Sequence, residues 1–216
     1  MTSTEVAWAV SRIWIGALTR VLVPLRQYGI ENVPTEGGVV LASNHLSWID
    51  IPVLGVLSPR RINFVAKSEA HEVPLLGWYI RLNGTLAVRR GESDREAVRQ
   101  MREAARTGSA LGLFVEGTRQ RSGRPGKVQP GAAMVALQEE VPVVPIAVYG
   151  TQFWRPGNFA PCSVAWGRPM HFDGLPKNAR GYREASAKIE RAIHTLFDWL
   201  AEVHAKGRPR GLTPPL

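Results

Sequence analysis

The sequence predicts an α/β fold, in which a single domain holds a mixed, largely parallel sheet flanked by helices. Its 216 residues suffice for one domain, and a chain of this size buries roughly 70% of its extended surface. Short apolar segments typical of buried strands alternate along the chain with segments of helical periodicity. Because helical segments separate most of these strands, neighbouring strands are expected to run parallel.

Composition narrows the class of protein. Apolar residues make up 44% of the chain and charged residues 21%, which excludes a mainly disordered protein. The single cysteine, Cys162, excludes a disulfide framework and fits a reducing compartment. The formal net charge of +9 indicates an anionic partner, and composition leaves open whether that is nucleic acid, a membrane surface or a phosphorylated substrate.

The first expected element is an amphipathic helix over residues 6–25. Arg12 and Arg20 lie on one arc of its helical wheel, together with Gly16 and Thr19. The opposite face is apolar and comprises Val6, Val10, Ile13, Trp14, Ala17, Val21 and Leu25. Two arginines disfavour a spanning helix, since each costs about 2.5–3.5 kcal/mol near a bilayer centre. Two interpretations stay open for this segment: a helix in the bilayer interface, or an amphipathic helix packed on the protein's own core.

The elements that follow alternate between strands and helices. Runs of aliphatic residues predict strands at 38–43, 62–66, 84–88, 111–115, 143–149 and 163–166. Helices are expected over the apolar stretch 48–57, and at 74–82, 93–105, 131–138 and 183–204. Ser93 and Glu96 form a capping box at the start of one of these helices. The chain thus divides into an N-terminal helix at 1–28, an α/β domain at 29–206 and a flexible tail at 207–216.

The segment Asn44-His45-Leu46-Ser47-Trp48-Ile49-Asp50 directly follows a predicted buried strand. Histidine transfers protons near neutral pH, and a carboxylate that accepts its second N–H fixes the tautomer and the ring orientation. Positions five apart diverge by about 140° on one continuous helix. His45 and Asp50 therefore meet only if His45 lies in a turn and Asp50 in the first turn of the next helix. The alternative is structural, with His45 capping the strand and Asp50 capping the helix.

Two further predicted strands end in charged residues. Glu116, Gly117 and Arg119 follow one of them; the glycine permits a tight turn, and the guanidinium fits phosphate or carboxylate. Arg89 and Arg90 follow the other. Because α/β domains place ligand sites at strand ends, these residues are candidates for substrate binding. The alternative is a surface ion pair between Glu116 and Arg119, which would contribute little.

Several other kinds of site are missing from the sequence. No Cys/His cluster has metal-ligand spacing, and neither a His-Glu-x-x-His motif nor a Walker-type phosphate-binding loop occurs. Cys162 follows Pro161 with no histidine nearby, so a packed, unreactive thiol is expected. We therefore expect no metal and no resident cofactor.

Four ordered segments together carry a resemblance to a known family. They are Asn44-His45-x4-Asp50, Gly84-x5-Arg90, Phe114-x-Glu116-Gly117-Thr118-Arg119 and Val141-Pro142-Val143-Val144-Pro145-Ile146. In this order they resemble the glycerolipid acyltransferases, in particular the 1-acylglycerol-3-phosphate O-acyltransferases, over about residues 29–150. The sequence departs from the family pattern at Val115, where proline is usual, and at Ala87 and Arg89, where an aromatic and an acidic residue are common.

The resemblance implies specific roles for these residues. His45 would be the general base, and Asp50 would orient it and stabilise its imidazolium form. The acceptor site would comprise Arg90, Glu116, Gly117, Thr118 and Arg119, with the arginines holding a phosphate. The departures at Ala87 and Arg89 bear on which acceptor is used rather than on the type of reaction.

The resemblance also implies the reaction and its partners. A fatty acyl group would pass from a thioester of CoA or acyl carrier protein, acting as co-substrate, to the hydroxyl of a lysophosphatidate-like acceptor, giving phosphatidate in phospholipid biosynthesis. A lipid acceptor favours the interfacial interpretation of the N-terminal helix and a location on the cytoplasmic face of the membrane. Nucleic acid is not expected, because no recognised binding module is present. The alternatives are another lysolipid or glycerol 3-phosphate as acceptor, or a non-catalytic basic protein that binds lipid or nucleic acid.

Overall fold

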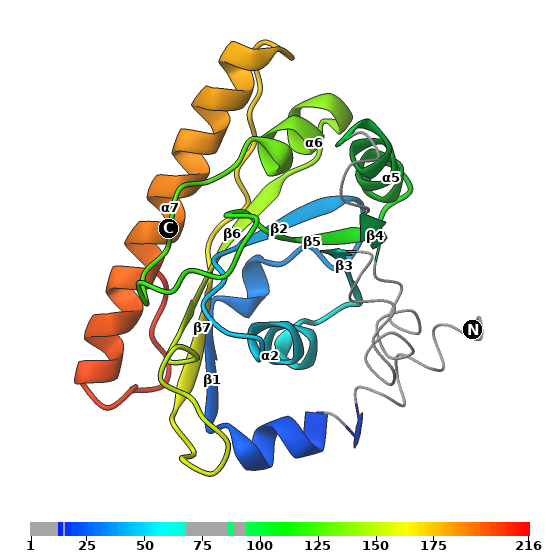
Figure 1. The fold of residues 1–216 in the computed structure, drawn as a ribbon. Coiled ribbons are helices and arrows are strands. Elements are labelled where there is room, and N and C mark those ends of the chain that lie inside the picture. Colours follow the sequence, from blue (N-terminus) through cyan, green and yellow to red (C-terminus); the bar gives the residue numbers. More distant parts are fainter. Residues whose placement is uncertain (1–12, 15, 68–85, 89–93) are drawn as a thin grey trace.

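The computed structural model describes residues 13–14, 16–67, 86–88 and 94–216 (Figure 1). Within these ranges one seven-stranded sheet has the order β1-β7-β6-β2-β5-β3-β4. The strands are β1 (Leu25–Tyr28), β2 (Val39–Ser43), β3 (Ile62–Lys67), β4 (Leu86–Val88), β5 (Ala110–Phe114), β6 (Val143–Tyr149) and β7 (Cys162–Trp166). Every neighbouring pair is parallel except β6 and β7. The predicted α/β fold with a mixed, largely parallel sheet is confirmed.

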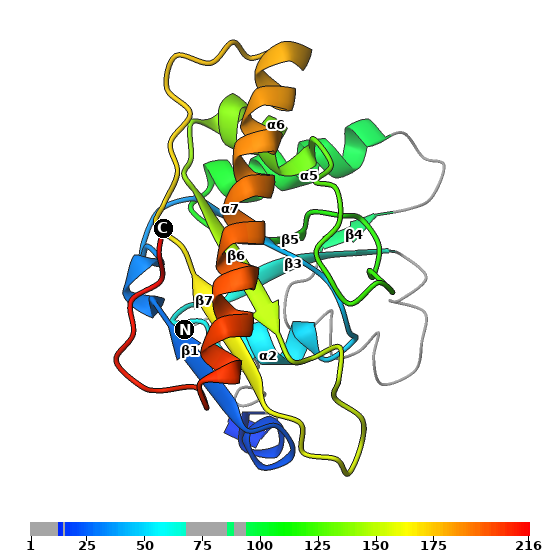
Figure 2. The ribbon, with the colours of Figure 1, turned by 90° about the vertical axis from the view of Figure 1, so that its left-hand side faces the viewer.

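Helices cover both faces of the sheet. They are α2 (Asp50–Leu57), α5 (Asp94–Arg106), α6 (Gly131–Glu139) and α7 (Ala179–Ala205), and a short 3-10 helix spans Ile30–Asn32. Side chains of the buried central strand β2 alternate: Val39 and Leu41 join the core on the α2 side, whereas Val40 and Ala42 join the core under α5 and α6. Figure 2 shows α7 lying across β6 and β7 on the same face as α5 and α6.

The N-terminal helix ends earlier than predicted. Residues 13–14 and 16–22 are helical, but Leu25–Tyr28 forms the edge strand β1, with Leu25 opposite Cys162 of β7. Pro24 explains the boundary, because a proline cannot continue a helix and restricts the residue before it. The helix predicted over residues 6–25 therefore ends too late, and the α/β domain begins at β1 rather than after an N-terminal segment of 1–28. Residues 1–12 lie outside the described residues, as does the predicted helix at 74–82.

The predicted flexible tail at 207–216 instead packs along the edge of the sheet. The hydroxyl of Tyr28 donates to the carbonyl of Pro209 (3.1 Å), and the backbone N–H of Arg168 donates to the carbonyl of Leu216 (3.0 Å). Figure 2 shows this segment running beside β1. These contacts cover the edge strand, which would otherwise expose unpaired backbone groups.

The long C-terminal helix also differs from its prediction. It begins at Ala179 rather than at residue 183, because the side chain of Asn178 accepts the backbone N–H groups of Arg180 and Gly181 (3.0 and 3.3 Å). No helix in the described ranges is long and apolar enough to cross a bilayer.

Candidate active site

The sheet brings two of the sequence motifs together. β2 and β5 are parallel neighbours with Ser43 opposite Phe114, and the backbone N–H of Val115 continues the ladder to the carbonyl of Ser43 (3.0 Å). The segments that leave the carboxyl ends of these two strands carry His45 and Glu116, respectively. Adjacent parallel strands thus place the predicted base beside the Glu116-Gly117-Thr118-Arg119 segment, as expected for an α/β ligand site.

His45 and Asp50 form a hydrogen-bonded pair. His45 lies in the turn after β2, Asp50 is the first residue of α2, and their Nδ1 and Oδ2 atoms are 2.8 Å apart. The same carboxylate oxygen accepts the backbone N–H groups of Leu46 and Ser47, each at 2.8 Å. Asp50 therefore fixes the turn and the imidazole ring with one oxygen, in the strand–turn–helix arrangement that the spacing required.

This geometry prepares the other ring nitrogen of His45 for proton transfer. A carboxylate only accepts hydrogen bonds, so Nδ1 carries the shared proton, and in the neutral imidazole the lone pair is on Nε2. The ring stacks on Phe114, with centroids 4.0 Å apart and planes at 19°. Asp50 is fully buried, and its Oδ1 has no hydrogen-bond partner in the described part of the chain. An imidazolium forming at His45 would meet a desolvated, incompletely neutralised carboxylate, which would stabilise it.

Glu116 holds the backbone of the turn. One of its carboxylate oxygens accepts the N–H of His45 and the other accepts the N–H of Gly126, both at 2.8 Å. The carbonyl of His45 in turn accepts the N–H of Gln120 (2.8 Å). Glu116 is only 6% exposed, and this burial raises its pKa to about 7 against the opposing effect of the two backbone N–H groups. The side chain predicted to contact the acceptor thus faces the protein's own backbone instead.

The residues after Glu116 lie at the surface beside the base. Gly117 adopts a left-handed conformation, with φ of 73°, which glycine accommodates without strain. Gly117, Thr118 and Arg119 are exposed, and Arg119 immediately precedes Gln120, whose backbone bonds to His45. Within the described ranges the Arg119 guanidinium has no hydrogen-bond or ion-pair partner, so the alternative, a surface ion pair with Glu116, does not form. Arg90 lies outside the described residues.

Asn44 completes the site, although the spacing argument assigned it no role. It is fully buried; its side-chain oxygen accepts the N–H of Val148 (2.7 Å), and its amide donates to the carbonyl of the same residue (3.1 Å). The side chain thereby continues the β2–β6 pairing beyond Ser43, where the main chain turns away. The sequence did contain a signal for this role, because an asparagine stands between a buried strand and the candidate base. A side-chain amide can accept a hydrogen bond from a backbone N–H and donate one to a backbone carbonyl, as a strand residue does.

Neither metal-ion chemistry nor thiol chemistry is supported by the described residues. They contain no cluster of three or more His, Cys, Asp or Glu side chains that could hold a metal ion. Cys162 is buried, as predicted, and this burial raises the pKa of its thiol to about 12.

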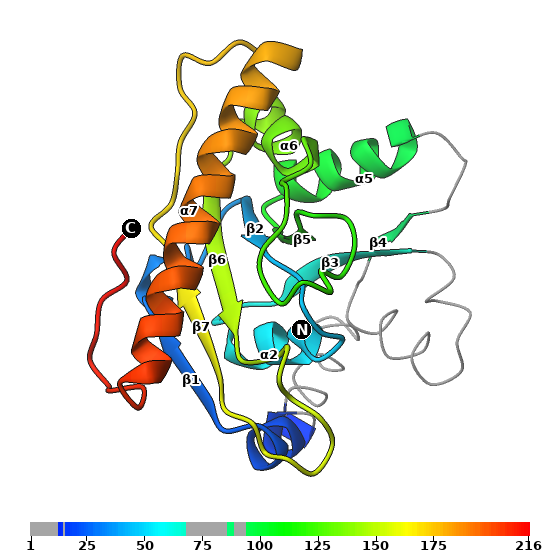
Figure 3. The same cartoon turned by 60° about the vertical axis from the view of Figure 1, so that its left-hand side comes forward.

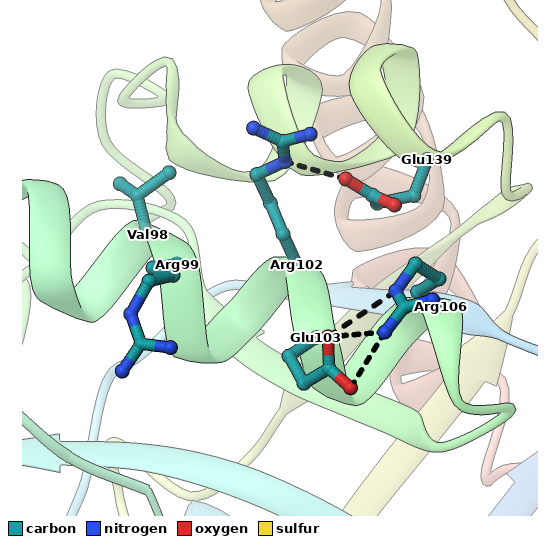
Figure 4. Close-up of a pocket in the computed structure, with 6 residues that line it drawn as sticks. All are labelled: Val98, Arg99, Arg102, Glu103, Arg106 and Glu139. Carbon is teal, nitrogen blue, oxygen red and sulfur yellow. Dashed lines mark hydrogen bonds and ion pairs between the residues drawn. The ribbon is translucent and has the colours of Figure 1, made fainter.

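A hollow between α5 and α6 lies away from His45. Figure 4 shows Arg102 reaching Glu139 and Arg106 paired with Glu103 at its walls. The C-terminal ends of these two helices precede the amino ends of β5 and β6, so the hollow lies near the edge of the sheet opposite His45. Its arginines are also engaged by carboxylates, and we do not assign substrate binding to it.

Comparison with known proteins agrees with this geometry. The acyltransferase family model matches residues 24–149, which is more than half of the chain. The chain belongs to the acyltransferase family. This acyltransferase is 29% identical over 205 residues to the 1-acyl-sn-glycerol-3-phosphate acyltransferase of Pseudomonas aeruginosa, covering 91% of this chain and 76% of the relative.

Further matches cover a shorter segment of the chain or concern its fold. A lyso-ornithine lipid O-acyltransferase of the same organism is 39% identical over 108 residues, which are 49% of this chain and 41% of that protein. Some longer relatives, including two chloroplast proteins, are matched over well under half of their length. The crystal structure of the 1-acyl-sn-glycerophosphate acyltransferase PlsC from Thermotoga maritima superposes with a TM-score of 0.75 at 24% identity, covering 95% of this chain and 84% of that one. That likeness independently supports the fold.

Proposed function

We propose that this acyltransferase moves a fatty acyl group from a thioester of CoA or acyl carrier protein to the free hydroxyl of lysophosphatidate, giving phosphatidate. The observation that carries the proposal is the His45–Asp50 pair, with its 2.8 Å contact and a free Nε2, at the strand ends beside Arg119. The name of the Pseudomonas relative supports the glycerophosphate acceptor.

The pair supports transfer without a covalent acyl-enzyme. His45 Nε2 takes the proton of the acceptor hydroxyl as its oxygen attacks the thioester carbonyl. The tetrahedral intermediate collapses by breaking its C–S bond, and the departing sulfur takes the proton back from the imidazolium. The products are the ester and the free thiol, and His45 returns to its starting state. Asp50 stabilises the imidazolium between these two steps.

Arg119 suits the acceptor's phosphate. Its guanidinium is exposed, has no partner within the described ranges and presents a planar donor fork that matches a phosphate. The left-handed turn at Gly117 exposes this segment beside the base. We assign Arg90 to the same phosphate from the sequence alone, with Gly117 and Thr118 contributing to the walls of the acceptor site.

The helical segment 13–22 supports docking on a membrane. Its Gly16 and Thr19 side faces the protein: Thr19 is buried, and a Cβ at Gly16 would contact Val56. The apolar face points outward, so that Ile13, Trp14 and Val21 are 68%, 74% and 70% exposed. A helix packed on its own core would bury this face. We therefore propose that it lies in the interface of the cytoplasmic leaflet, where the acceptor resides.

A lyso-ornithine lipid is a second candidate acceptor, favoured by the 39% identity to an enzyme named for it. Such a lipid offers a carboxylate in place of the phosphate, and the guanidinium of Arg119 fits either group. The departures at Ala87 and Arg89 from the usual glycerophosphate pattern are compatible with this choice.

An acyl-transfer assay with mass-spectrometric detection of the lipid product tests the proposal. Lysophosphatidate, lyso-ornithine lipid, glycerol 3-phosphate and lysophosphatidylcholine are each supplied with palmitoyl-CoA and with palmitoyl-acyl carrier protein. We expect phosphatidate as the main product, formed in equal amount to free thiol. Preferred acylation of the lyso-ornithine lipid would transfer the assignment to that acceptor, and thioester loss without a lipid product would overturn it.

A further inference from the structure

The loop that joins β6 to β7, residues 150–161, exposes two aromatic side chains. Phe153 is 59% exposed and Phe159 is 51% exposed. Figures 1 and 3 show this loop beside the helical segment 13–22 at the same end of the molecule. Neither ring belongs to the catalytic site described above, so their exposure needs a separate explanation.

Trp154 contacts both the helical segment 13–22 and the turn at residues 44–49 that holds His45, which we call the catalytic turn. It is buried, and its indole N–H donates to the carbonyl of Leu22 at the end of the helix (3.1 Å). Its ring also meets Trp48 edge-on, with centroids 5.6 Å apart. Trp48 lies between His45 and Asp50 in the chain and is itself 58% exposed. Helix, loop and catalytic turn therefore form one connected apolar surface.

The backbone conformation of Phe159 is unfavourable for a large side chain, which indicates that the phenyl ring makes a contact outside the loop. Its φ is +48°, a left-handed conformation that is strained for a bulky residue and is normally occupied by glycine or asparagine. The preceding residue, Asn158, holds the loop by accepting the backbone N–H groups of Arg155 and Ala160 (3.0 and 3.1 Å). Folding of the loop alone would favour a smaller residue at 159, yet an exposed phenyl ring stands there.

The charges of this surface match one kind of partner. Residues 13–24 contain a single charged residue, Arg20, and residues 150–161 contain a single charged residue, Arg155. Both are cationic, and both are exposed. Exposed aromatic and aliphatic side chains without acidic neighbours suit a bilayer with anionic headgroups, because apolar burial and electrostatic attraction then act together.

We propose that the β6–β7 loop is a second membrane-docking element, which inserts Phe159 and Phe153 into the interface of an anionic bilayer beside the helical segment 13–22. The proposal rests on the proposed function insofar as a lipid acceptor requires a bilayer. Two contact regions on either side of Trp154 fix the orientation of the protein on the membrane, so that the turn holding His45 meets the lipid surface. An acceptor can then reach the base without leaving the bilayer.

Vesicle partitioning of the full chain tests the proposal through Phe159→Asn. Asparagine tolerates the left-handed conformation, so the variant should unfold at the same temperature as the wild type or higher. On vesicles of phosphatidylglycerol and phosphatidylcholine we expect its partition coefficient to fall about tenfold, as for loss of one buried phenyl ring. Phe159→Trp should restore binding, and Leu212→Ser, which removes an exposed leucine from the tail, should leave it unchanged.

Turnover of a short-chain, water-soluble lysophosphatidate separates this proposal from the proposed function. We expect Phe159→Asn to keep this turnover within about twofold of the wild type while losing vesicle binding. Unchanged partitioning of a folded Phe159→Asn variant would overturn the docking role. So would a change in oligomeric state by analytical ultracentrifugation without a change in partitioning, since the loop would then contact a second copy of the chain. Absence of turnover in every variant and in the wild type would count against the proposed function instead.

Discussion

The catalytic turn and the helical segment 13–22 reverse the ordinary pattern of burial in opposite senses. The turn and its neighbours bury polar groups: Asn44 and Asp50 are fully buried and Glu116 is 6% exposed. The helical segment exposes apolar groups, with Trp14 at 74% and Val21 at 70%. Buried polar side chains require hydrogen-bond partners, and large exposed apolar faces require a cover, so both regions are costly unless they serve a function.

The difference separates two tasks within one small domain. Around His45, backbone N–H groups donate hydrogen bonds to the side chains of Asp50, Glu116 and Asn44. These hydrogen bonds hold the turn in one conformation. On the helical segment, the outward side chains are apolar and form no hydrogen bonds with the backbone, so they suit the interior of a fluid bilayer. Under the proposed function, the hydrogen-bonded turn holds the base, and the exposed apolar face gives access to a lipid.

The largest expected effect comes from removing the base. His45→Ala should lower turnover by about 10²–10⁴-fold on any acceptor, because this is the usual contribution of a general base. The acyl-transfer rate and the unfolding temperature are measured together. A folded variant that keeps more than about a tenth of the wild-type rate would remove His45 from the mechanism.

The exposed helix face gives the next effect. Trp14→Glu combined with Val21→Glu should release the protein from anionic vesicles by about 100-fold, because two apolar contacts are replaced by charges that the headgroups repel. Cosedimentation with vesicles measures the loss, and Leu216→Ser is a control at an exposed apolar residue of the tail. Retained binding would show that this face is not the docking surface.

Arg119 offers a smaller effect within the catalytic region. Arg119→Lys keeps the charge but loses the planar fork, so the KM for the acceptor should rise about tenfold while the KM for the thioester stays nearly constant. Steady-state kinetics with each substrate varied in turn distinguishes the two. A rise confined to the thioester KM would place Arg119 on the donor side.

Glu116 provides a last effect, which is on stability rather than on activity and depends on pH. Its pKa of about 7 exceeds the ordinary carboxyl value of 4.5, so the folded state retains a proton that the unfolded state releases. Stability should therefore fall as pH rises from about 4.5 to 7, by at most about 1.4 kcal/mol per pH unit. Urea unfolding of Glu116→Gln should lack this decline. Identical pH profiles for variant and wild type would mean that burial does not perturb Glu116.

The sequence predicted the His45–Asp50 pair more reliably than the direction of the neighbouring Glu116 side chain. The spacing of His45 and Asp50 showed that they can meet only in a strand–turn–helix, and the resemblance to the acyltransferases indicated that they do. The direction of Glu116 could not be predicted, since a motif does not show whether a carboxylate faces a ligand or the neighbouring backbone. That choice depends on the turn at His45 and on Gly126, which the tertiary fold brings to it.

Elements that depend on distant partners were also missed. β1 follows an apolar helical segment directly, and its four residues form a strand because β7 lies beside them. The tail is ordered by contacts with Tyr28 and Arg168, which local composition does not reveal. The helical wheel predicted a polar face and an apolar face for the N-terminal helix. Only the structure showed that Thr19 faces the protein and Trp14 faces outward.

The ratio of two rates tests the separation of tasks most directly. Turnover is measured for the wild type, His45→Ala and the Trp14→Glu/Val21→Glu variant, on vesicle-embedded lysophosphatidate and on a short-chain, water-soluble analogue. We expect His45→Ala to lose both activities, and the helix variant to lose the vesicle activity while keeping the soluble one within about twofold of the wild type. Equal loss of both activities in a folded helix variant would contradict the account, because the helix would then belong to the catalytic core.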